Sequence, residues 1–331
     1  MSDAEYLPFL VDAFGRRHTY LRLAVTDRCN LRCLYCMPPE GVVLQPRAEI
    51  LRYDEIVRLV RLLAGMGVCK VRLTGGEPLI RKDLESLIAG LARVDGVQTL
   101  ALTTNGVLLR AHAAALKAAG LTRLNVSLDT LRAGRFERIT RRAHLKDVLD
   151  GIDAALAAGF APVKVNMVVM GGQNDDELAD FAELTRERPL HVRFIEYMPF
   201  PGNRWRQATL VSYEQMLAVL KARYPLRPAF PLAGPQVARE YEIPGFRGRI
   251  GFITPMTAHF CDSCSRLRIT AEGQLRTCLF RAPQGSLRDA LRGGASDRDM
   301  ETLIREAVAR KPERHHAHAE RADRCMAQIG G

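Results

Sequence analysis

The chain has 331 residues, of which 47% are hydrophobic and 26% charged, a composition that is ordinary for a globular protein and excludes extensive disorder. The formal net charge of +11 and the pI near 9.5 indicate an anionic partner, but charge alone does not separate nucleic acid, a membrane surface and a phosphorylated small molecule. No uncharged apolar stretch approaches about 18 residues, and the first residues lack the pattern of an export signal, so we expect neither membrane spanning nor secretion.

A group of cysteines follows the first predicted strand, which covers residues 21–26. Cys29, Cys33 and Cys36 have the spacing Cys-x3-Cys-x2-Cys. Three thiols cannot all pair among themselves, and thiolates are ligands for iron-sulfur clusters, zinc and Cu(I). A cubane cluster held by three of them would leave one iron open to another ligand. Zinc would need a fourth ligand at structural spacing, and none follows before Glu40.

Beyond this loop, β-rich runs alternate with helical stretches. The helix over 53–66, for example, carries apolar residues at helical spacing. Six β/α units whose strands show no polar alternation predict a parallel sheet covered by helices. Eight units would close a full barrel, so six predict a partial barrel with an open side. The other predicted strands cover 70–74, 99–103, 123–127, 163–169 and 190–195, and the other predicted helices cover 83–92, 108–119, 145–158, 175–186 and 214–222.

Prolines at positions 225, 228, 231 and 235 mark a connector. We therefore predict an α/β domain over residues 1–225 and a smaller domain over residues 226–331.

Glycine and polar residues follow the strands, at the edge where ligands bind in parallel sheets. Gly75 and Gly76 would let the backbone approach a ligand closely, and Glu77 offers an acceptor, although a tight turn alone would use the same glycines. Ser127 ends another strand at this edge. Met198, after the sixth strand, could pack either on a cofactor or in the core.

A second cysteine group lies near the C-terminus. Cys261, Cys264 and Cys278 fit another cluster with an open iron. A zinc site that uses His259 as a fourth ligand is the alternative, although His259 lies awkwardly close to the first cysteine. Cysteines at ligand spacing imply a reducing compartment, so we expect a cytoplasmic protein.

Cationic residues are unusually dense at strand positions and directly after the second cysteine pair. An unpaired buried charge costs several kcal/mol, so cations that point into a barrel imply an anionic occupant. A triphosphate-like ligand fits this pattern better than seven separately solvated side chains do. These candidates are Arg22, Lys70, Arg72, Lys164, Arg193, Arg266 and Arg268.

The first cysteine group, with Tyr35 just before its last member, resembles the signature of the radical S-adenosylmethionine (radical SAM) superfamily. The resemblance implies a [4Fe-4S] cluster whose fourth iron chelates SAM, and an electron from the cluster that cleaves SAM to a 5′-deoxyadenosyl radical. It also implies that the Gly-Gly-Glu-Pro turn receives the SAM amino group. The residues that would contact SAM are Tyr35, Gly76, Glu77, Ser127 and Met198.

Over roughly residues 16–331, the chain resembles the GTP 3′,8-cyclase family of molybdenum cofactor biosynthesis. The match lies in residues 21–30, 35–38, 72–79, 127–129 and 196–200, in the late cysteine group and in the terminal Gly330-Gly331. It implies a second [4Fe-4S] cluster that binds the guanine of GTP. The residues it implies as GTP contacts are Arg22, Arg72, Thr103, Lys164, Arg266, the backbone of Leu267, and Arg268.

The same resemblance implies the reaction. Abstraction of the ribose 3′ hydrogen and attack on guanine C8 would give (8S)-3′,8-cyclo-7,8-dihydroguanosine 5′-triphosphate. The implied partners are a flavodoxin-like or ferredoxin-like electron donor and a downstream cyclic pyranopterin monophosphate synthase. The assembly could be a homodimer, and we expect neither nucleic acid nor a membrane as partner.

Two positions depart from the family pattern, and two other functions remain open. Ser265 and Arg204 replace the usual Asn and Gly, which leaves substrate affinity and loop flexibility open. A peptide-modifying radical SAM enzyme would carry more cysteines near the C-terminus, where only Cys325 is available. A zinc-dependent nucleic-acid-binding protein would also use the positive charge, and its binding would weaken steeply with salt.

Overall fold

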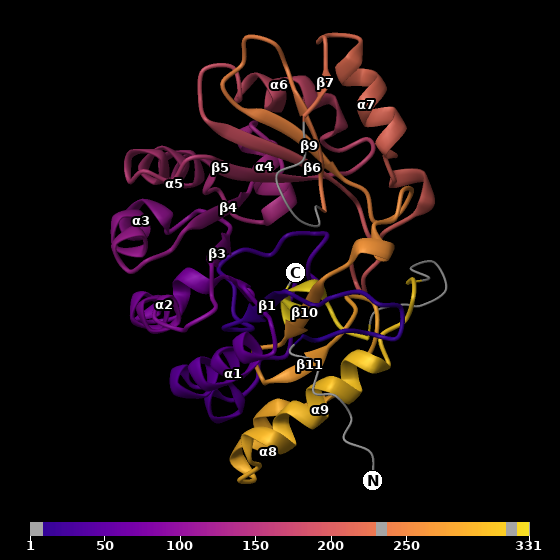
Figure 1. Ribbon diagram of the computed structural model, residues 1–331. Helices are drawn as coiled ribbons and strands as arrows, with labels where there is room; N and C mark the ends of the chain where they lie inside the picture. Colours follow the sequence, from indigo (N-terminus) through magenta and orange to yellow (C-terminus); the bar gives the residue numbers. More distant parts are fainter. Residues whose placement is uncertain (1–8, 230–236, 316–322, 331) are drawn as a thin grey trace.

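The computed structural model describes residues 9–229, 237–315 and 323–330 (Figure 1). Its strands form one sheet in the order β12-β11-β10-β1-β2-β3-β4-β5-β6-β9-β8-β7. The six strands that come first in the chain, β1 to β6, are parallel to one another and neighbours in chain order. They span β1 (Tyr20–Ala24), β2 (Lys70–Thr74), β3 (Thr99–Thr104), β4 (Arg123–Ser127), β5 (Val163–Val169) and β6 (Leu190–Glu196).

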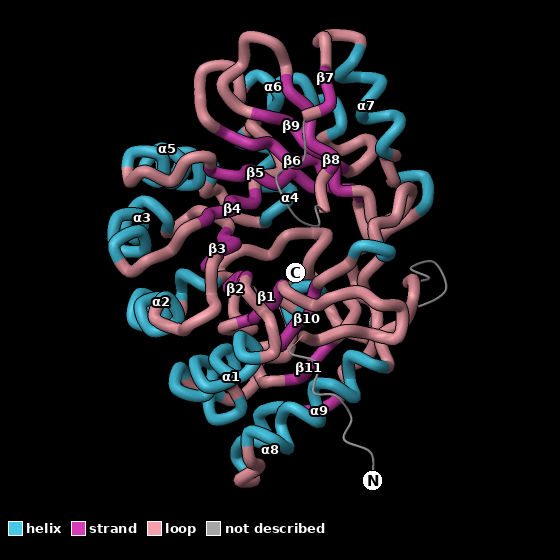
Figure 2. Tube along the Cα trace, viewed as in Figure 1, coloured by secondary structure: helices cyan, strands magenta, loops and turns pink. Residues whose placement is uncertain are grey.

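Helices connect these strands and cover one face of the sheet (Figures 1 and 2). They are α1 (Tyr53–Gly65), α2 (Leu84–Ala92), α3 (Leu109–Ala118), α4 (Ala133–Thr140), α5 (Leu145–Ala157), α6 (Leu178–Glu183) and α7 (Tyr213–Lys221). Short 3-10 helices lie at η1 (Arg47–Glu49), η2 (Pro78–Ile80), η3 (Asp175–Glu177), η4 (Gln207–Thr209) and η5 (Cys261–Ser263). No helix among the described residues is long and apolar enough to cross a membrane.

The predicted alternation of strands and helices is present, with two differences. α4 is an additional helix that the sequence pattern did not predict, because four of its eight residues are charged or carry a hydroxyl group and only Phe136 and Ile139 are large and apolar. The predicted helix over 175–186 is instead a 3-10 turn followed by the shorter α6. Its buried Glu177 accepts hydrogen bonds from Thr130 and from the backbone of Leu131, which holds the helix start against the preceding loop.

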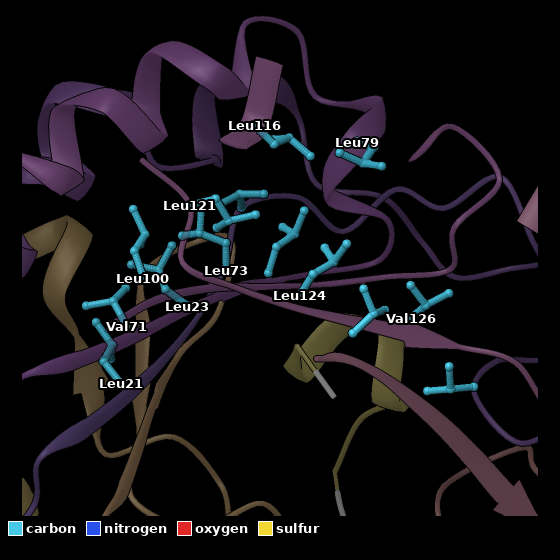
Figure 3. Packing of buried hydrophobic residues seen from close by; sticks show 14 of the residues in the cluster. Leu21, Leu23, Val71, Leu73, Leu79, Leu100, Leu116, Leu121, Leu124 and Val126 are labelled. Atoms are coloured by element: carbon cyan, nitrogen blue, oxygen red, sulfur yellow. The ribbon is translucent and has the colours of Figure 1, made fainter. Parts of the chain in front are cut away.

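The two faces of the sheet differ in chemistry. Figure 3 shows Leu21, Leu23, Val71 and Leu73, which belong to the same buried hydrophobic cluster as Leu116 of α3 on the helix side. On the other face the polar strand positions face inward, and β5 and β6 alternate strictly between buried and half-buried residues. The expectation of strands without polar alternation is therefore wrong for β5 and β6, where only one face of the sheet is packed against helices, whereas β1 to β4 are buried at most positions.

The C-terminal third adds strands to both edges of the same sheet. β9 (Arg249–Ile253) pairs parallel to β6, and β10 (Arg266–Ile269) pairs parallel to β1. Residues 254–265 therefore connect one edge of the sheet to the other. Antiparallel strands complete the edges: β7 (Arg227–Pro228), β8 (Arg239–Glu242), β11 (Gln274–Arg276) and β12 (Gly285–Ser286). The helices of this part are α8 (Leu287–Arg292), α9 (Asp297–Ala309) and α10 (Met326–Ile329).

The predicted division into 1–225 and 226–331 stays a prediction. The described strands after residue 226 belong to the same sheet as β1–β6.

Candidate functional site

The first cysteine group lies in the loop that follows β1. This loop is held against α4, because the backbone N–H of Arg32 donates to the carbonyl oxygen of Thr140 (2.9 Å) and that of Leu34 donates to Ile139 (3.0 Å). Cys36 closes a turn by donating its N–H to the carbonyl of Cys33 (3.0 Å). The missed helix α4 therefore supports the loop that carries the three thiols.

The three thiols lie in one low-dielectric environment. Burial raises the pKa of Cys29 to about 11 and that of Cys33 well above its usual value. The charges of Asp129, Cys36 and Cys29 raise the pKa of Cys33 further. Burial also raises the pKa of Cys36. A cationic metal group would supply the positive charge that stabilises three thiolates here.

Three cysteine thiols are a donor set of the soft kind that suits an iron-sulfur cluster. Among the described residues, no three His, Cys, Asp or Glu side chains are arranged to hold one metal ion. A cubane has iron atoms at separate corners and takes thiolates spread around it. Cys29 also accepts a backbone N–H from Leu31 (Sγ to N, 3.4 Å), as cluster thiolates commonly do.

The glycine turn after β2 packs directly on the first cysteine loop. Gly75 has φ 146°, and a Cβ at Gly76 would lie 2.1 Å from the carbonyl oxygen of Arg28. The N–H groups of Gly76 and Glu77 donate to the carbonyls of Thr26 (2.8 Å) and Arg28 (2.7 Å). Only residues without a side chain allow this approach.

Glu77 is occupied by the chain itself. Its carboxylate is buried and accepts hydrogen bonds from the N–H of Leu79 (3.0 Å), the hydroxyl of Thr104 (2.7 Å) and the N–H of Asn105 (2.6 Å). Burial raises the pKa of this carboxyl group. Glu77 thus connects the turns after β2 and β3 by hydrogen bonds, a role that the sequence motif did not reveal.

The remaining predicted SAM contacts lie around the same loop. Tyr35 is buried and packs with Tyr197 and Met170. Asn203 donates from its amide to the carbonyls of Tyr35 (3.2 Å) and Met198 (2.8 Å), which ties the loop after β6 to the cysteine loop. Met198 packs against an apolar cluster that includes Phe200, Met256 and Ile329. Ser127 ends β4 and pairs in register with Asn166 of β5.

The inner face of the sheet is cationic. Arg268, Arg22 and Arg72 lie in one row, since Arg22 pairs in register with both of the others. Arg72 donates to the hydroxyl of Thr103 (3.2 Å). Burial, and then the charge of Arg193, lower the pKa of Lys164 to about 7. The predicted cations on the strands therefore converge on one surface.

Several buried polar atoms on this face have no hydrogen-bond partner among the described residues. An unpartnered buried polar atom is costly, so these atoms indicate a polar ligand. Arg193 is neutralised within the chain, because one of its terminal nitrogens donates to Glu240 of β8 (2.6 Å), although its Nε has no partner. The unpartnered atoms are Arg22 Nε, Asn125 Oδ1, Asn166 Oδ1, His191 Nδ1 and Arg193 Nε.

Sequence reasoning missed Tyr20, which lies among the same cations. Arg72 Nε donates to its hydroxyl oxygen (2.6 Å), and the ammonium of Lys70 lies 4.4 Å from its ring centre. Burial would raise its pKa, but the charges of Arg72, Arg22 and Lys70 lower the pKa to about 6. The period-two spacing from Tyr20 to Arg22 was the signal that could have revealed it.

The second cysteine group lies at the other end of β1 and β10 from the first group, so the arginine row, which crosses these strands, lies between the two groups. Cys261 begins η5 and Cys264 follows it, just before β10. The first residue of β10, Arg266, pairs with Tyr20 at the start of β1. The first cysteine group follows the other end of β1. Burial would raise the pKa of Cys264, but the charges of Arg266 and Lys311 lower it to about 6. Cys278 follows β11 and packs near Phe280.

The C-terminal tail lies between the two cysteine groups. The carbonyl oxygen of Gly330 accepts hydrogen bonds from Arg268 Nη1 (3.0 Å) and from Thr74 Oγ1 (3.3 Å). Gly331, the other residue of the terminal glycine pair, lies outside the described residues.

Comparisons with known proteins define the class first. A family model described as Radical SAM superfamily matches residues 23–185. The fold is similar to Streptococcus suis SuiB bound to S-adenosylmethionine (TM-score 0.57, 14% identity, 84% of this chain and 67% of that one). It is also similar to a radical SAM methyltransferase from Sphaerobacter thermophilus (TM-score 0.51, 16% identity, 73% of this chain and 71% of that one). The chain has a radical SAM α/β fold, and this superfamily implies a [4Fe-4S] cluster and SAM.

The relatives are more specific. A second family model, Molybdenum Cofactor Synthesis C, matches residues 190–317. The chain is 48% identical to the GTP 3′,8-cyclase of Moorella thermoacetica over 97% of this chain and 99% of that protein. It is 50% identical to Molybdenum cofactor biosynthesis protein 1 of Homo sapiens over 94% of this chain and 49% of that protein. The chain spans about half the length of the first animal relatives that it matches. It belongs to the GTP 3′,8-cyclase family.

Proposed function

We propose that the chain converts GTP to (8S)-3′,8-cyclo-7,8-dihydroguanosine 5′-triphosphate in the first step of molybdenum cofactor biosynthesis. The observation that carries this proposal is the row of Arg268, Arg22 and Arg72 between two cysteine groups at opposite ends of β1 and β10. A polyanion on this row would lie within reach of both groups. In the proposed architecture, β1–β6 form a partial barrel, and residues 226–331 are a smaller domain that carries the second cluster.

Each cysteine group would hold one [4Fe-4S] cluster. Cys29, Cys33 and Cys36 would hold the first, with SAM against Tyr35, Gly76, Glu77, Ser127 and Met198. When bound, the cluster and SAM supply a one-electron reductant and a carbon radical that removes the ribose 3′ hydrogen. Because Glu77 already accepts three hydrogen bonds from the chain, its contribution would be to fix the glycine backbone that faces SAM.

The second cluster would be held by Cys261, Cys264 and Cys278, with the guanine of GTP at its open iron. Charge-assisted hydrogen bonds from the inner-face cations would hold the triphosphate and orient the ribose. The buried surroundings would exclude water from a reactive site. The proposed GTP contacts are Arg22, Lys70, Arg72, Thr103, Lys164, Arg193, Arg266, the backbone of Leu267, and Arg268.

The partners follow from this reaction. An electron donor of the flavodoxin or ferredoxin kind would reduce the clusters, and a cyclic pyranopterin monophosphate synthase would consume the product. All eight cysteines are unpaired, which fits the proposed reducing, cytoplasmic location. We propose no nucleic acid or membrane partner, and a homodimer is one assembly to test.

Deuterium transfer tests the proposed function. GTP carrying deuterium at ribose C3′ is incubated with SAM, dithionite and the anaerobically reconstituted protein. We expect deuterium in 5′-deoxyadenosine and a cyclised product by mass spectrometry. Deoxyadenosine without deuterium, or no product from GTP, would contradict the proposal.

A further inference from the structure

A buried lysine with no carboxylate partner lies beside the second cysteine group. Lys311 is only 4% exposed, and it follows the C-terminal end of α9. Its Nζ donates to the carbonyl oxygen of Arg266 (2.9 Å) and contacts the sulfur of Cys264 (3.5 Å). Among the described residues, no carboxylate forms an ion pair with Lys311. A buried ammonium is costly unless an anion lies nearby, so the sulfur is its available counter-charge.

A buried carboxylate in this region, Asp12, is already paired with other residues. Asp12 accepts from Arg16 Nε (2.7 Å) and lies 3.0 Å from His18 Nε2. Arg16 in turn donates to the carbonyl of Cys261 (2.8 Å) and to that of Pro312 (2.7 Å). This arginine therefore fixes the cysteine turn and the backbone next to Lys311 as one unit. The arrangement leaves the ammonium of Lys311 directed at Cys264.

We propose that Lys311 is a positioning residue for the second cluster. Its ammonium group holds the Cys264 thiolate by an N–H···S hydrogen bond and raises the reduction potential of that cluster. The proposal rests on the second cluster of the proposed function. Reduction adds negative charge that is shared with the thiolates, so a nearby cation and hydrogen-bond donor stabilise the reduced form more than the oxidised form. Arg266 also forms a hydrogen bond to Cys264, but it is a proposed contact of the triphosphate, whereas Lys311 is not a proposed contact of the substrate.

The experiment isolates the second cluster in the full chain. A Cys29→Ala, Cys33→Ala, Cys36→Ala background is reconstituted anaerobically and analysed for iron and sulfide without GTP. Dithionite then donates one electron to each cluster, and electron paramagnetic resonance follows the reduced form at poised potentials. Lys311→Met and Lys311→Gln are compared with Arg310→Met, which removes the neighbouring cation, whose side chain is 57% exposed.

We expect a more negative midpoint potential for Lys311→Met, a smaller shift for Lys311→Gln, which keeps an N–H donor, and no shift for Arg310→Met. An unchanged midpoint in Lys311→Met at full iron content overturns the inference. If Lys311→Met retains no iron, an unchanged midpoint in Lys311→Gln overturns it. A background protein that binds no iron would instead contradict the proposed second cluster, so the two failures are distinguishable.

Discussion

Individual side chains on the inner face are tuned by burial and by their neighbours. Lys164 illustrates this, because it shares the face with Arg193, Arg72 and Lys70 and is largely enclosed. Its pKa is lowered to about 7 mainly by burial, so near neutral pH it is divided between the neutral and the charged form. An anionic ligand would favour the charged form.

GTP binding at pH 8 is therefore expected to take up protons through Lys164. The free lysine is mostly neutral above pH 7, and the bound triphosphate raises its pKa, so GTP affinity falls as pH rises above 7. Calorimetry in two buffers of different ionisation enthalpy measures this uptake. Lys164→Gln should remove it, and equal proton uptake in that variant would contradict the assignment.

The buried position of His18 predicts that the stability of the fold depends on pH. Burial, followed by the charge of Lys311, lowers its pKa to about 4, although Asp12 opposes the shift. The unfolded histidine binds a proton below its ordinary value of about 6.5, whereas the folded one does so only near 4. The contribution of His18 to the free energy of unfolding is thus fully present above about pH 6.5. It is lost as pH falls toward 4, by up to about 1.4 kcal/mol per pH unit.

Urea unfolding at pH 5 and pH 7 measures this dependence. His18→Gln should show a smaller loss of stability between the two pH values than the unchanged chain. An identical loss would assign the pH dependence to other groups.

At the scale of elements, turns bring distant segments into contact. The turn after β2 is pinned to the first cysteine loop, and the space at Gly76 admits no side chain. The glycine pair therefore determines how the loop of Cys29 sits on the sheet, whatever it contributes to SAM binding.

Gly76→Ala is expected to destabilise the protein by about 1–3 kcal/mol and to lower iron retention at the first cysteine group, because the new methyl overlaps the Arg28 carbonyl. Gly90→Ala is the control. Gly90 lies inside α2, where a Cβ would lie 3.4 Å from a methyl of Val57 in α1. Replacing a helix glycine by alanine adds up to about 1 kcal/mol to the stability of the helix. Similar iron content in both variants would contradict the role of the Gly76 contact.

For the whole molecule, the decisive feature is the connection across the two sheet edges. Residues 254–265 run from β9 to β10 and carry two of the late cysteines. Glu196, buried at the end of β6, holds the start of this segment by accepting from the N–H groups of Met256 (2.7 Å) and Thr257 (3.0 Å) and from Tyr213 (3.1 Å).

Glu196→Gln should lower iron content at the second cysteine group more than at the first. An amide offers one acceptor oxygen where the carboxylate offers two, and hydrogen bonds to a charged group are worth about 1.5–3 kcal/mol each. Iron analysis in backgrounds that lack one cysteine group or the other separates the sites. Equal loss at both would mean that Glu196 supports the sheet as a whole.

The sequence by itself determined what local pattern encodes. The spacing of the two cysteine groups, the six β/α units and the cations at strand positions could all be read from it, because ligand spacing and strand periodicity are properties of short segments. The family followed from the motifs that these segments carry.

Only the tertiary structure decided which groups meet. Arg193 is neutralised by Glu240, Glu77 braces two turns, and Lys311 reaches Cys264. It also decided that β9 and β10 add to opposite sides of the six parallel strands, and that the two cysteine groups lie at opposite ends of β1 and β10 with the arginine row between them. These contacts join residues far apart in the chain. Strand pairing and burial select them, and no local pattern records either one.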